Sequence, residues 1–335
     1  MAQRKWVSVA SVVLALGLAA CGGGGDEGVE PVAPEVPNVQ RVVVFGDSLS
    51  DSGTWAPVAH MVGGGKATTN PGPVWAEAVA MQLGVALTPA VEADATGAIQ
   101  ACPKPGCFNY AQSGARVTDI GGALPYPVEQ QLANFYAASD HTFNGNSDVV
   151  FVLAGSNDVF YWANMANTPG SGVTPEVAMA QVQRVASELV GYVNDMISKN
   201  ATQLYVLNLP DSSLTPAGSA ADAPLVNAFN ATLQSGLMGT TARVIDFNTQ
   251  FADVIYNGAQ FGFVNTNMPA CDPAKIDALV PGAGGSTLFC TADTLVAPGA
   301  DQTYLFADGV HPTTGGHRLI ASNVLQRLRA DGVTH

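Results

Sequence analysis

Short apolar runs without alternation recur along the chain and are separated by longer segments with helical periodicity. The runs lie at residues 42–45, 149–153, 204–209 and 244–247. Runs of this length are typical of strands that are buried on both faces. Helical patterns lie between or beside them, at residues 74–83, 127–138, 225–237 and 316–329. Strands that alternate with helices predict a parallel sheet with right-handed crossovers and helices on both faces.

The clearest predicted helix begins at Thr174, whose hydroxyl suits an N-cap position. Pro175 suits the first turn, and the acidic Glu176 favours the positive end of the helix dipole. Apolar residues then follow in steps of three and four, at Val182, Val185, Leu189, Val193 and Met196. One face of this helix is therefore expected to pack on the sheet.

Two long irregular stretches, residues 90–107 and 257–305, interrupt the alternation. Loops of this length commonly form lids or binding walls, and plain surface insertions are the alternative. The chain shows no internal repeat, and its 47% hydrophobic content is ample for a large core. We therefore expect one globular domain over residues 41–335.

The first residues have the pattern of an export signal. Arg4 and Lys5 precede an apolar segment at residues 7–18, and Leu-Ala-Ala-Cys follows at residues 18–21. This ending resembles the bacterial lipobox, in which the cysteine is acylated. We expect a signal peptide at residues 1–20, a lipid anchor on Cys21 and a flexible tether at residues 21–40. The expected location is the bacterial cell envelope, as an outer-membrane lipoprotein; a secreted or periplasmic protein with an ordinary signal peptide is the alternative.

Charge and cysteine content narrow the partners. The formal net charge of −14 would repel phosphate backbones, which argues against nucleic acid as a partner. With Cys21 assigned to lipid, four cysteines remain, and export places them in an oxidising compartment. Three pairings are open, of which the most local, Cys102 with Cys107 and Cys271 with Cys290, is favoured. The sequence has no Cys-x-x-Cys and no histidine pair at ligand spacing that would suggest a metal site.

Ser48 directly follows the first predicted strand, at the point where the chain must turn. Open α/β sheets place their ligand crevices beyond the carboxyl ends of the strands, so this hydroxyl is a candidate nucleophile. The alternative is an ordinary turn in which Ser48 caps the next helix.

A serine nucleophile needs a base that is oriented by an acid. Asp308 and His311 are suitably spaced, because an aspartate three residues before a histidine can accept the Nδ1 proton and leave Nε2 as the base. The alternative is that the two residues merely close a loop. His60 is not excluded as the base by spacing alone.

Acyl transfer also needs donors to a developing oxyanion. Gly114 lies in a loop where its backbone N–H is accessible, and Asn157 follows the predicted strand at 149–153, so its amide stands at the same sheet edge. An ordinary glycine turn and an Asx turn are the alternatives.

Together these segments resemble the four sequence blocks of the GDSL, or SGNH, hydrolase family. The blocks are Gly-Asp-Ser-Leu at residues 46–49, Gly114, Gly-x-Asn-Asp at residues 155–158 and Asp-x-x-His at residues 308–311. The longer string at residues 45–53 is similar to the branch of bacterial lecithinase/haemolysin-like lipases. Thr54 departs from that branch, which often has asparagine there. The Gly-x-Ser-x-Gly elbow of α/β-hydrolases is absent from the sequence.

The resemblance implies a flavodoxin-like three-layer α/β/α sandwich with about five parallel strands. It also implies a catalytic triad of Ser48, Asp308 and His311, with an oxyanion hole formed by Ser48, Gly114 and Asn157. No cofactor and no metal are needed for this chemistry.

The expected partner is an ester substrate, either a lipid or a short-chain acyl ester, and hydrolysis or acyl transfer both fit. Trp55, Phe160 and Trp162 lie near the motifs in sequence and are candidates to line a substrate pocket, with helix-to-sheet packing as the alternative. A carbohydrate O-acetyl esterase and a non-catalytic surface lipoprotein remain alternative functions. The sequence indicates neither the oligomeric state nor the acyl chain length.

Overall fold

The computed structural model describes residues 39–333 except residues 95, 97, 103, 119–123 and 139–141. All of its described elements belong to one compact unit, residues 36–335. The predicted signal peptide, Cys21 and nearly all of the predicted tether lie outside the described residues, and they stay predictions. Within the part that is described, no helix is both long and apolar enough to cross a membrane.

Four parallel strands form the central sheet, in the order β1-β4-β5-β6. They are β1 (Arg41–Gly46), β4 (Asp148–Leu153), β5 (Gln203–Leu207) and β6 (Arg243–Ile245). Almost every side chain of β1, β4 and β5 is buried, because helices cover both faces of the sheet. The prediction of a parallel α/β fold is confirmed.

The predicted fifth strand is reduced to a single bridge beside β1. Val44 donates to the carbonyl of Phe108 and accepts from the N–H of Tyr110, so that Val44 and Asn109 form an isolated parallel bridge. The segment leaves the sheet at once because the Asn109 side chain bonds the carbonyl of Ser50 and the N–H of Ala111. If this bridge is counted as the second strand along the chain, the strand order of the sheet follows the flavodoxin-like pattern. The sheet itself has four strands and not about five.

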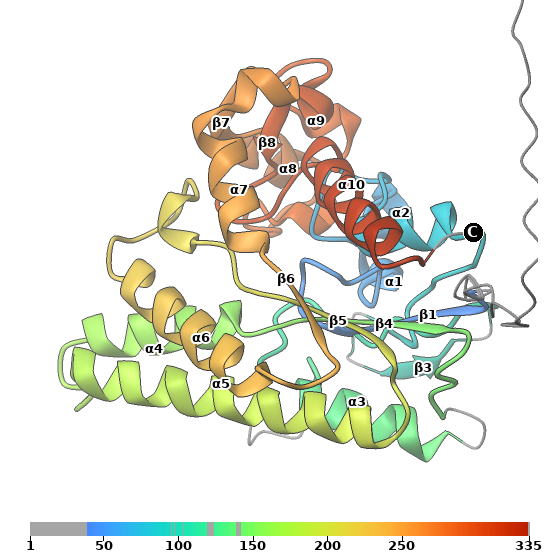
Figure 1. The fold of residues 1–335 in the computed structure, drawn as a ribbon. Coiled ribbons are helices and arrows are strands. Elements are labelled where there is room, and N and C mark those ends of the chain that lie inside the picture. Colours follow the sequence, from blue (N-terminus) through green and yellow to red (C-terminus); the bar gives the residue numbers. More distant parts are fainter. Residues whose placement is uncertain are drawn as a thin grey trace, which may run out of the picture. The chain divides into compact units, whose positions relative to one another are not determined.

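Helices form a layer on each side of the sheet (Figure 1). One layer contains α3 (Val128–Ala137), α4 (Ser156–Asn167), α5 (Pro175–Ser198) and α6 (Asp222–Leu237). The other contains α2 (Trp75–Gln82), α7 (Phe247–Tyr256) and α10 (Thr314–Ala330). Helix α5 begins as predicted, with the Thr174 hydroxyl accepting the N–H of Val177.

Among the helices that cover the sheet, α4 and α7 were not expected. The apolar run at residues 244–247 predicts one strand, yet β6 ends at Ile245 and Phe247 begins α7. The Asp246 carboxylate accepts the N–H of Thr249 and so caps the helix at this point. A short apolar run does not by itself distinguish a strand from the first turn of a helix. Strand β5 likewise ends at Leu207 and not at residue 209.

The two irregular stretches contain short elements of their own. Residues 90–107 include the antiparallel pair β2 (Val91–Ala93) and β3 (Ile99–Ala101). Residues 257–305 include β7 (Asn265–Pro269), α8 (Pro273–Leu279) and α9 (Ala300–Thr303), and β7 pairs in parallel with β8 (Tyr304–Phe306). The remaining helix is α1 (Ala56–Ala59), and short 3₁₀ turns include η2 (Ser212–Leu214) and η4 (Thr287–Phe289).

The second stretch has a small hydrophobic core separate from the main one. Its buried residues include Ile276, Leu295 and the two cysteines of the Cys271–Cys290 disulfide. The first stretch carries the Cys102–Cys107 disulfide. Both cysteine pairs therefore lie at disulfide distance, in the pairing that was favoured.

Candidate active site

Ser48 stands at the carboxyl edge of the sheet because β1 ends at a residue that has no side chain. Gly46 has φ +149°, and a Cβ there would lie 2.0 Å from the carbonyl oxygen of Leu153. The Gln131 side chain bonds both the N–H and the carbonyl of Gly46, at 2.9 and 2.8 Å. The nucleophile turn is thus fixed to the neighbouring strand and to helix α3.

The structure brings Ser48, His311 and Asp308 together. His311 Nε2 lies 2.9 Å from Ser48 Oγ, and His311 Nδ1 lies 2.7 Å from Asp308 Oδ2. Because a carboxylate can only accept a hydrogen bond, Nδ1 carries the proton and donates a hydrogen bond to Asp308. Nε2 is then free to accept the serine proton, which is the protonation pattern that a general base requires.

Asp308 and His311 lie in a tight turn between β8 and α10. Asp308 Oδ1 accepts the backbone N–H groups of Val310 and His311, at 2.8 and 2.7 Å. The N–H of Ala307 donates to the carbonyl of His311 at 2.7 Å and closes the turn. Thr68 donates to the carbonyl of Pro312 at 3.0 Å, so residues near the beginning of the domain also support it.

The electrostatics of the pair favour an ion pair once the histidine is protonated. Burial alone would raise the pKa of Asp308, but the charge of His311 and the bonds to Oδ1 and Oδ2 outweigh it and hold the pKa at about 2. Burial opposes the charged form of His311, yet Asp308 and then Asp47 raise its pKa above the ordinary value. His311 therefore has a base strength suited to taking the serine proton.

Asp47 is a buried carboxyl next to the nucleophile. Its Oδ1 accepts the N–H of Leu49 at 3.1 Å, and its Oδ2 has no hydrogen-bond partner among the described residues. Burial raises the pKa of Asp47 to about 7. This carboxyl is thus a second group, besides Asp308, whose charge acts on His311.

The loop that carries Gly114 is held against the nucleophile turn. Gln112 donates its N–H to the carbonyl of Gly46 at 3.1 Å, and Asp51 Oδ2 accepts both the N–H and the hydroxyl of Ser113 at 2.8 and 2.9 Å. Gly114 follows with φ +88°. The N–H groups of Ser48 and Gly114 have no hydrogen-bond partner within the described residues. Both are available to bind an oxyanion.

Asn157 lies in the first turn of α4, directly after β4. Its Nδ2 donates to the carbonyl of Ala115 at 2.8 Å, which leaves the second amide hydrogen free. The adjacent Asp158 is buried and accepts from Arg116 Nε at 2.9 Å and from the N–H of Val117 at 2.8 Å. Burial, partly offset by these bonds, raises the pKa of Asp158 to about 6. The Gly114 loop is therefore fastened to α4 as well as to β1.

A largely apolar cavity of about 230 Å³ opens beside Ser48 and His311. Asn157 lines it, together with apolar side chains that come from α4, α7, the turn after β1 and the segments after β5 and before α10. Those apolar residues are Leu49, Phe160, Pro210, Ala217, Phe247, Phe251, Val310 and Pro312. An acyl group could therefore lie against the apolar wall of this cavity, next to the hydroxyl of Ser48.

Of the three aromatic candidates, the structure places one at the cavity. Phe160 lines it, whereas Trp55 and Trp162 are not among its lining residues. Trp162 packs against the core and against the ring of Tyr161, at 5.0 Å between centroids. Phe247 and Phe251 were missed because they belong to the unexpected helix α7. The signal available was their position after β6, at the same edge of the sheet as Ser48.

His60, which spacing alone had left open, bonds the carbonyl of Pro57 through Nδ1 and is exposed. No group of three or more potential ligand side chains that could hold a metal ion occurs in the described part of the chain.

A serine whose hydroxyl contacts an aspartate-bound histidine, with unpaired N–H groups beside it, is typical of serine hydrolases. Comparison with known families identifies the kind of hydrolase. The model of the GDSL-like lipase/acylhydrolase family matches residues 42–324, which include Ser48, Asp308 and His311. The chain belongs to this family. Membership supports the assignment of the protein as a hydrolase that acts on esters.

More distant likenesses exist among solved structures. An α/β hydrolase enzyme from the metagenome of Lake Arreo, Spain, is 14% identical, with 88% of this chain and 96% of that chain covered and a TM-score of 0.42. The lipase/acylhydrolase from Enterococcus faecalis is 14% identical, with 88% and 97% covered and a TM-score of 0.40. An acetylxylan esterase from Geobacillus stearothermophilus is 14% identical, with 88% and 95% covered and a TM-score of 0.44. No curated protein matches the chain.

Proposed function

We propose that this protein is a serine ester hydrolase that acts through Ser48, His311 and Asp308. The observation that carries the proposal is the continuous line of contacts from Ser48 Oγ to His311 Nε2, and from His311 Nδ1 to Asp308 Oδ2, at 2.9 and 2.7 Å. Few structural roles would need a buried serine, a histidine and a carboxylate in this order at the mouth of an apolar cavity.

The reaction follows from this geometry. His311 Nε2 takes the Ser48 proton as Oγ attacks the ester carbonyl, and Asp308 stabilises the imidazolium that forms. The Ser48 and Gly114 N–H groups and the free amide hydrogen of Asn157 bind the oxyanion. The imidazolium then gives its proton to the leaving alcohol, and an acyl group remains on Ser48. Water, deprotonated by His311, attacks the acyl-enzyme and releases the acid and the free serine.

The apolar cavity supports an acyl ester as the substrate, with the acyl group against Phe160, Phe247 and Phe251. Lipid esters, including lysophospholipids, and short-chain esters fit this description, as does transfer of the acyl group to another alcohol. The motif string at residues 45–53 supports the lecithinase/haemolysin-like branch of the family.

The test uses a fluorophosphonate probe together with a panel of esters of increasing acyl length that includes a lysophospholipid and an acetylated sugar. Ser48→Ala is expected to abolish labelling and to reduce turnover to background, because it removes the hydroxyl that contacts His311 Nε2. The matched control is Ser52→Ala, in the same motif, whose Oγ is buried without a hydrogen-bond partner in the described residues. It is expected to keep both labelling and turnover.

Activity that survives in a folded Ser48→Ala variant would overturn the triad, and a folded wild-type protein that neither labels nor hydrolyses any ester would support the non-catalytic alternative. Turnover of the acetylated sugar alone would replace the lipid-ester proposal with a carbohydrate O-acetyl esterase.

We also propose that the protein is exported and anchored to the membrane by a lipid on Cys21. The basic start, the apolar segment and the Leu-Ala-Ala-Cys ending support this proposal. Cys21→Ser is expected to prevent incorporation of radiolabelled palmitate and to move the protein out of the membrane fraction of a bacterial host. Unchanged fractionation of the variant, with no label on the wild type, would favour an ordinary signal peptide.

A further inference from the structure

The acid of the triad has a contact that no motif indicated. Thr287, in turn η4 of the 257–305 stretch, is buried and donates its hydroxyl to Asp308 Oδ2 at 3.1 Å. This is the same oxygen that accepts the Nδ1 proton of His311 at 2.7 Å. Thr287 does not line the cavity beside Ser48. It therefore touches the group that orients the base, and not the place where a substrate would bind.

The turn that carries Thr287 is itself tightly held. The N–H of Cys290 donates to the carbonyl of Thr287 at 3.0 Å and closes the turn. The buried side-chain amide of Asn70 donates to the carbonyls of Thr287 and Cys290, at 3.1 and 3.2 Å. The backbone N–H of Asn70 also donates to the carbonyl of Cys290, at 2.8 Å. Gly65 adds a bond from its N–H to the carbonyl of Leu288 at 2.8 Å.

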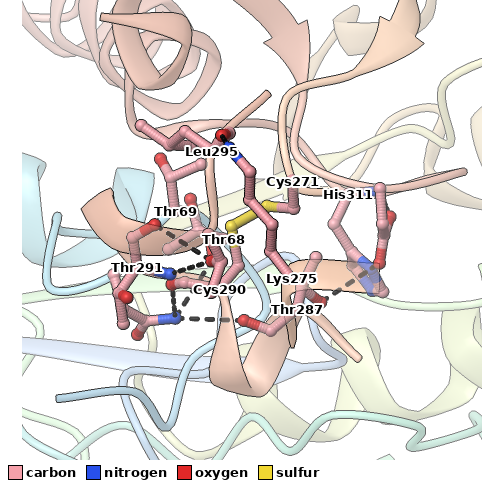
Figure 2. Close-up of a disulfide and its surroundings, with 12 residues drawn as sticks. Thr68, Thr69, Cys271, Lys275, Thr287, Cys290, Thr291, Leu295 and His311 are labelled. Atoms are coloured by element: carbon pink, nitrogen blue, oxygen red, sulfur yellow. Dashed lines mark hydrogen bonds and ion pairs between the residues drawn. A yellow bond between two sulfur atoms is a disulfide. The ribbon is translucent and has the colours of Figure 1, made fainter. Parts of the chain in front are cut away.

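The Cys271–Cys290 disulfide connects this turn to the backbone beside Asp308. Cys271 donates its N–H to the carbonyl of Ala307 at 3.0 Å, and Ala307 directly precedes Asp308. Covalent and hydrogen bonds thus form a closed ring from Thr287 through Cys290, Cys271 and Ala307 to Asp308, and back to Thr287. Figure 2 shows the disulfide, Thr287 and His311 in one view.

We propose that Thr287 is a positioning residue for Asp308, and that the Cys271–Cys290 disulfide holds it in that position. Asp308 Oδ1 is fixed by the N–H groups of Val310 and His311, whereas Oδ2 is bonded to His311 Nδ1 and to the Thr287 hydroxyl. Thr287 thus gives Oδ2 a support that does not come from the histidine that it orients. The inference rests on the proposed function, because it assigns the disulfide-bonded stretch a part in orienting the base.

Another charged group acts on His311 without passing through Thr287. Asp47 acts from the turn after β1. His317 on α10 is also buried, but burial lowers its pKa to about 3, so it carries no charge at the pH of the assay. No hydrogen bond joins either side chain to Thr287 in the described part of the chain. A substitution at residue 287 therefore reaches His311 through Asp308.

The test is Thr287→Val, which keeps the shape of the side chain and removes its hydroxyl. We expect kcat to fall about tenfold with KM unchanged, because a hydrogen bond to a charged group is lost outside the substrate cavity. The acid limb of the pH profile is expected to move to lower pH, since Asp308 Oδ2 is then held less firmly beside His311 and raises the pKa of His311 less. Thr287→Ser is expected to restore both.

The matched control is Thr294→Val, in the same stretch. Thr294 is equally buried and donates its hydroxyl to the carbonyl of Thr291 at 3.0 Å, away from Asp308. It is expected to lose stability without changing the pH profile. The positioning role would be overturned if Thr287→Val had the kcat and the pH profile of the wild type. It would also be overturned if Thr294→Val showed the same changes as Thr287→Val.

The disulfide is tested by a comparison of two double variants. Cys271→Ala with Cys290→Ala is expected to lower kcat and to shift the acid limb, whereas Cys102→Ala with Cys107→Ala is expected to do neither. If the first double variant does not fold, the two Thr287 variants decide the question of positioning. Ser48→Ala separates the two proposals: if it stays active, the proposed function fails, whereas an inactive Ser48→Ala beside a wild-type-like Thr287→Val refutes only this inference.

Discussion

Ser48 follows β1, a strand of six residues within the four-stranded central sheet, whereas Asp308 and His311 follow β8, a strand of three residues in a separate two-stranded sheet. The first sheet lies in the main hydrophobic core, with Val42–Phe45 fully buried. The second joins the two cores, because Leu305 and Phe306 of β8 belong to the main core and Tyr304 packs against the small one. The Ser48 turn and the Asp308–His311 turn thus follow strands of two sheets of different size.

The two halves also differ in the side chains that hold them. In the nucleophile half, buried carboxylates collect backbone N–H groups: Asp51 binds the loop before Gly114, and Asp158 binds the loop after it. In the acid–base half, Asp308 Oδ1 likewise accepts the N–H groups of Val310 and His311, but the neutral side chains of Thr68 and Asn70 add bonds to backbone carbonyls there. Charge-assisted bonds are stronger than neutral ones, so the bonds from Thr68 and Asn70 are expected to be the weaker supports.

Because different side chains hold the two halves, a substitution in one half is expected to leave the geometry of the other half unchanged. A variant in the nucleophile half should alter binding of the oxyanion at an unchanged base, and a variant that changes the charge beside His311 should alter the base at an unchanged oxyanion site. Two predictions sharpen this separation.

Asn157→Ala is expected to give the larger effect, a loss of roughly 10²–10³ in kcat, because it removes one of the three proposed oxyanion donors. The acid limb of the pH profile should stay in place, because His311 is untouched. The measurement is the kcat of ester hydrolysis across pH, with folding checked by thermal unfolding.

The matched control for Asn157→Ala is Asn164→Ala, an exposed asparagine of the same helix. It should hydrolyse esters like the wild type. A wild-type kcat in Asn157→Ala would remove this residue from the oxyanion site.

Asp47→Asn is expected to give the smaller effect, a shift of the acid limb of kcat/KM to lower pH. His311 acts as a base only when neutral, and its pKa is raised above the ordinary histidine value of about 6.5. Activity of the wild type should therefore fall as the pH drops through that raised pKa. Asp47, whose own pKa is about 7, is ionised over the upper part of this limb and is there one cause of the increase, so His311 of the variant stays neutral to slightly lower pH.

The control for Asp47→Asn is Asp195→Asn, at an exposed carboxylate paired with Lys199 on α5. Its acid limb should coincide with that of the wild type. A limb that moves to higher pH in Asp47→Asn would contradict the assigned interaction between Asp47 and His311.

The sequence was sufficient to predict the parallel α/β class and the residues that meet at the sheet edge. The roles of Ser48 and Asn157 could be predicted because both residues follow predicted strands, and that of Gly114 because it lies in a glycine turn. Asp308 and His311 could be predicted as a pair because their spacing allows a direct contact. Thr287 could not be proposed. It lies in an irregular stretch where no periodicity or motif indicates which side chain faces Asp308.

The aromatic candidates show a second limit. Phe160 and Trp162 are two residues apart in helix α4, so they point in directions that differ by about 200° around its axis. When one faces the cavity, the other faces away from it. Without the assignment of α4 as a helix, nearness in the sequence gave no reason to separate them. The reduced fifth strand has a similar origin, because the side chain of Asn109 ends the pairing with β1.

The nucleophile and its base are 263 residues apart in the chain. During synthesis, Ser48 emerges long before His311 does, and the support for the base comes from both ends of that interval. A growing polypeptide that stops short of His311 therefore carries a serine with no partner to activate it. Esterase activity should consequently appear late, only when nearly the whole domain has been made, and the cell that produces the protein is spared a reactive hydroxyl on unfinished chains.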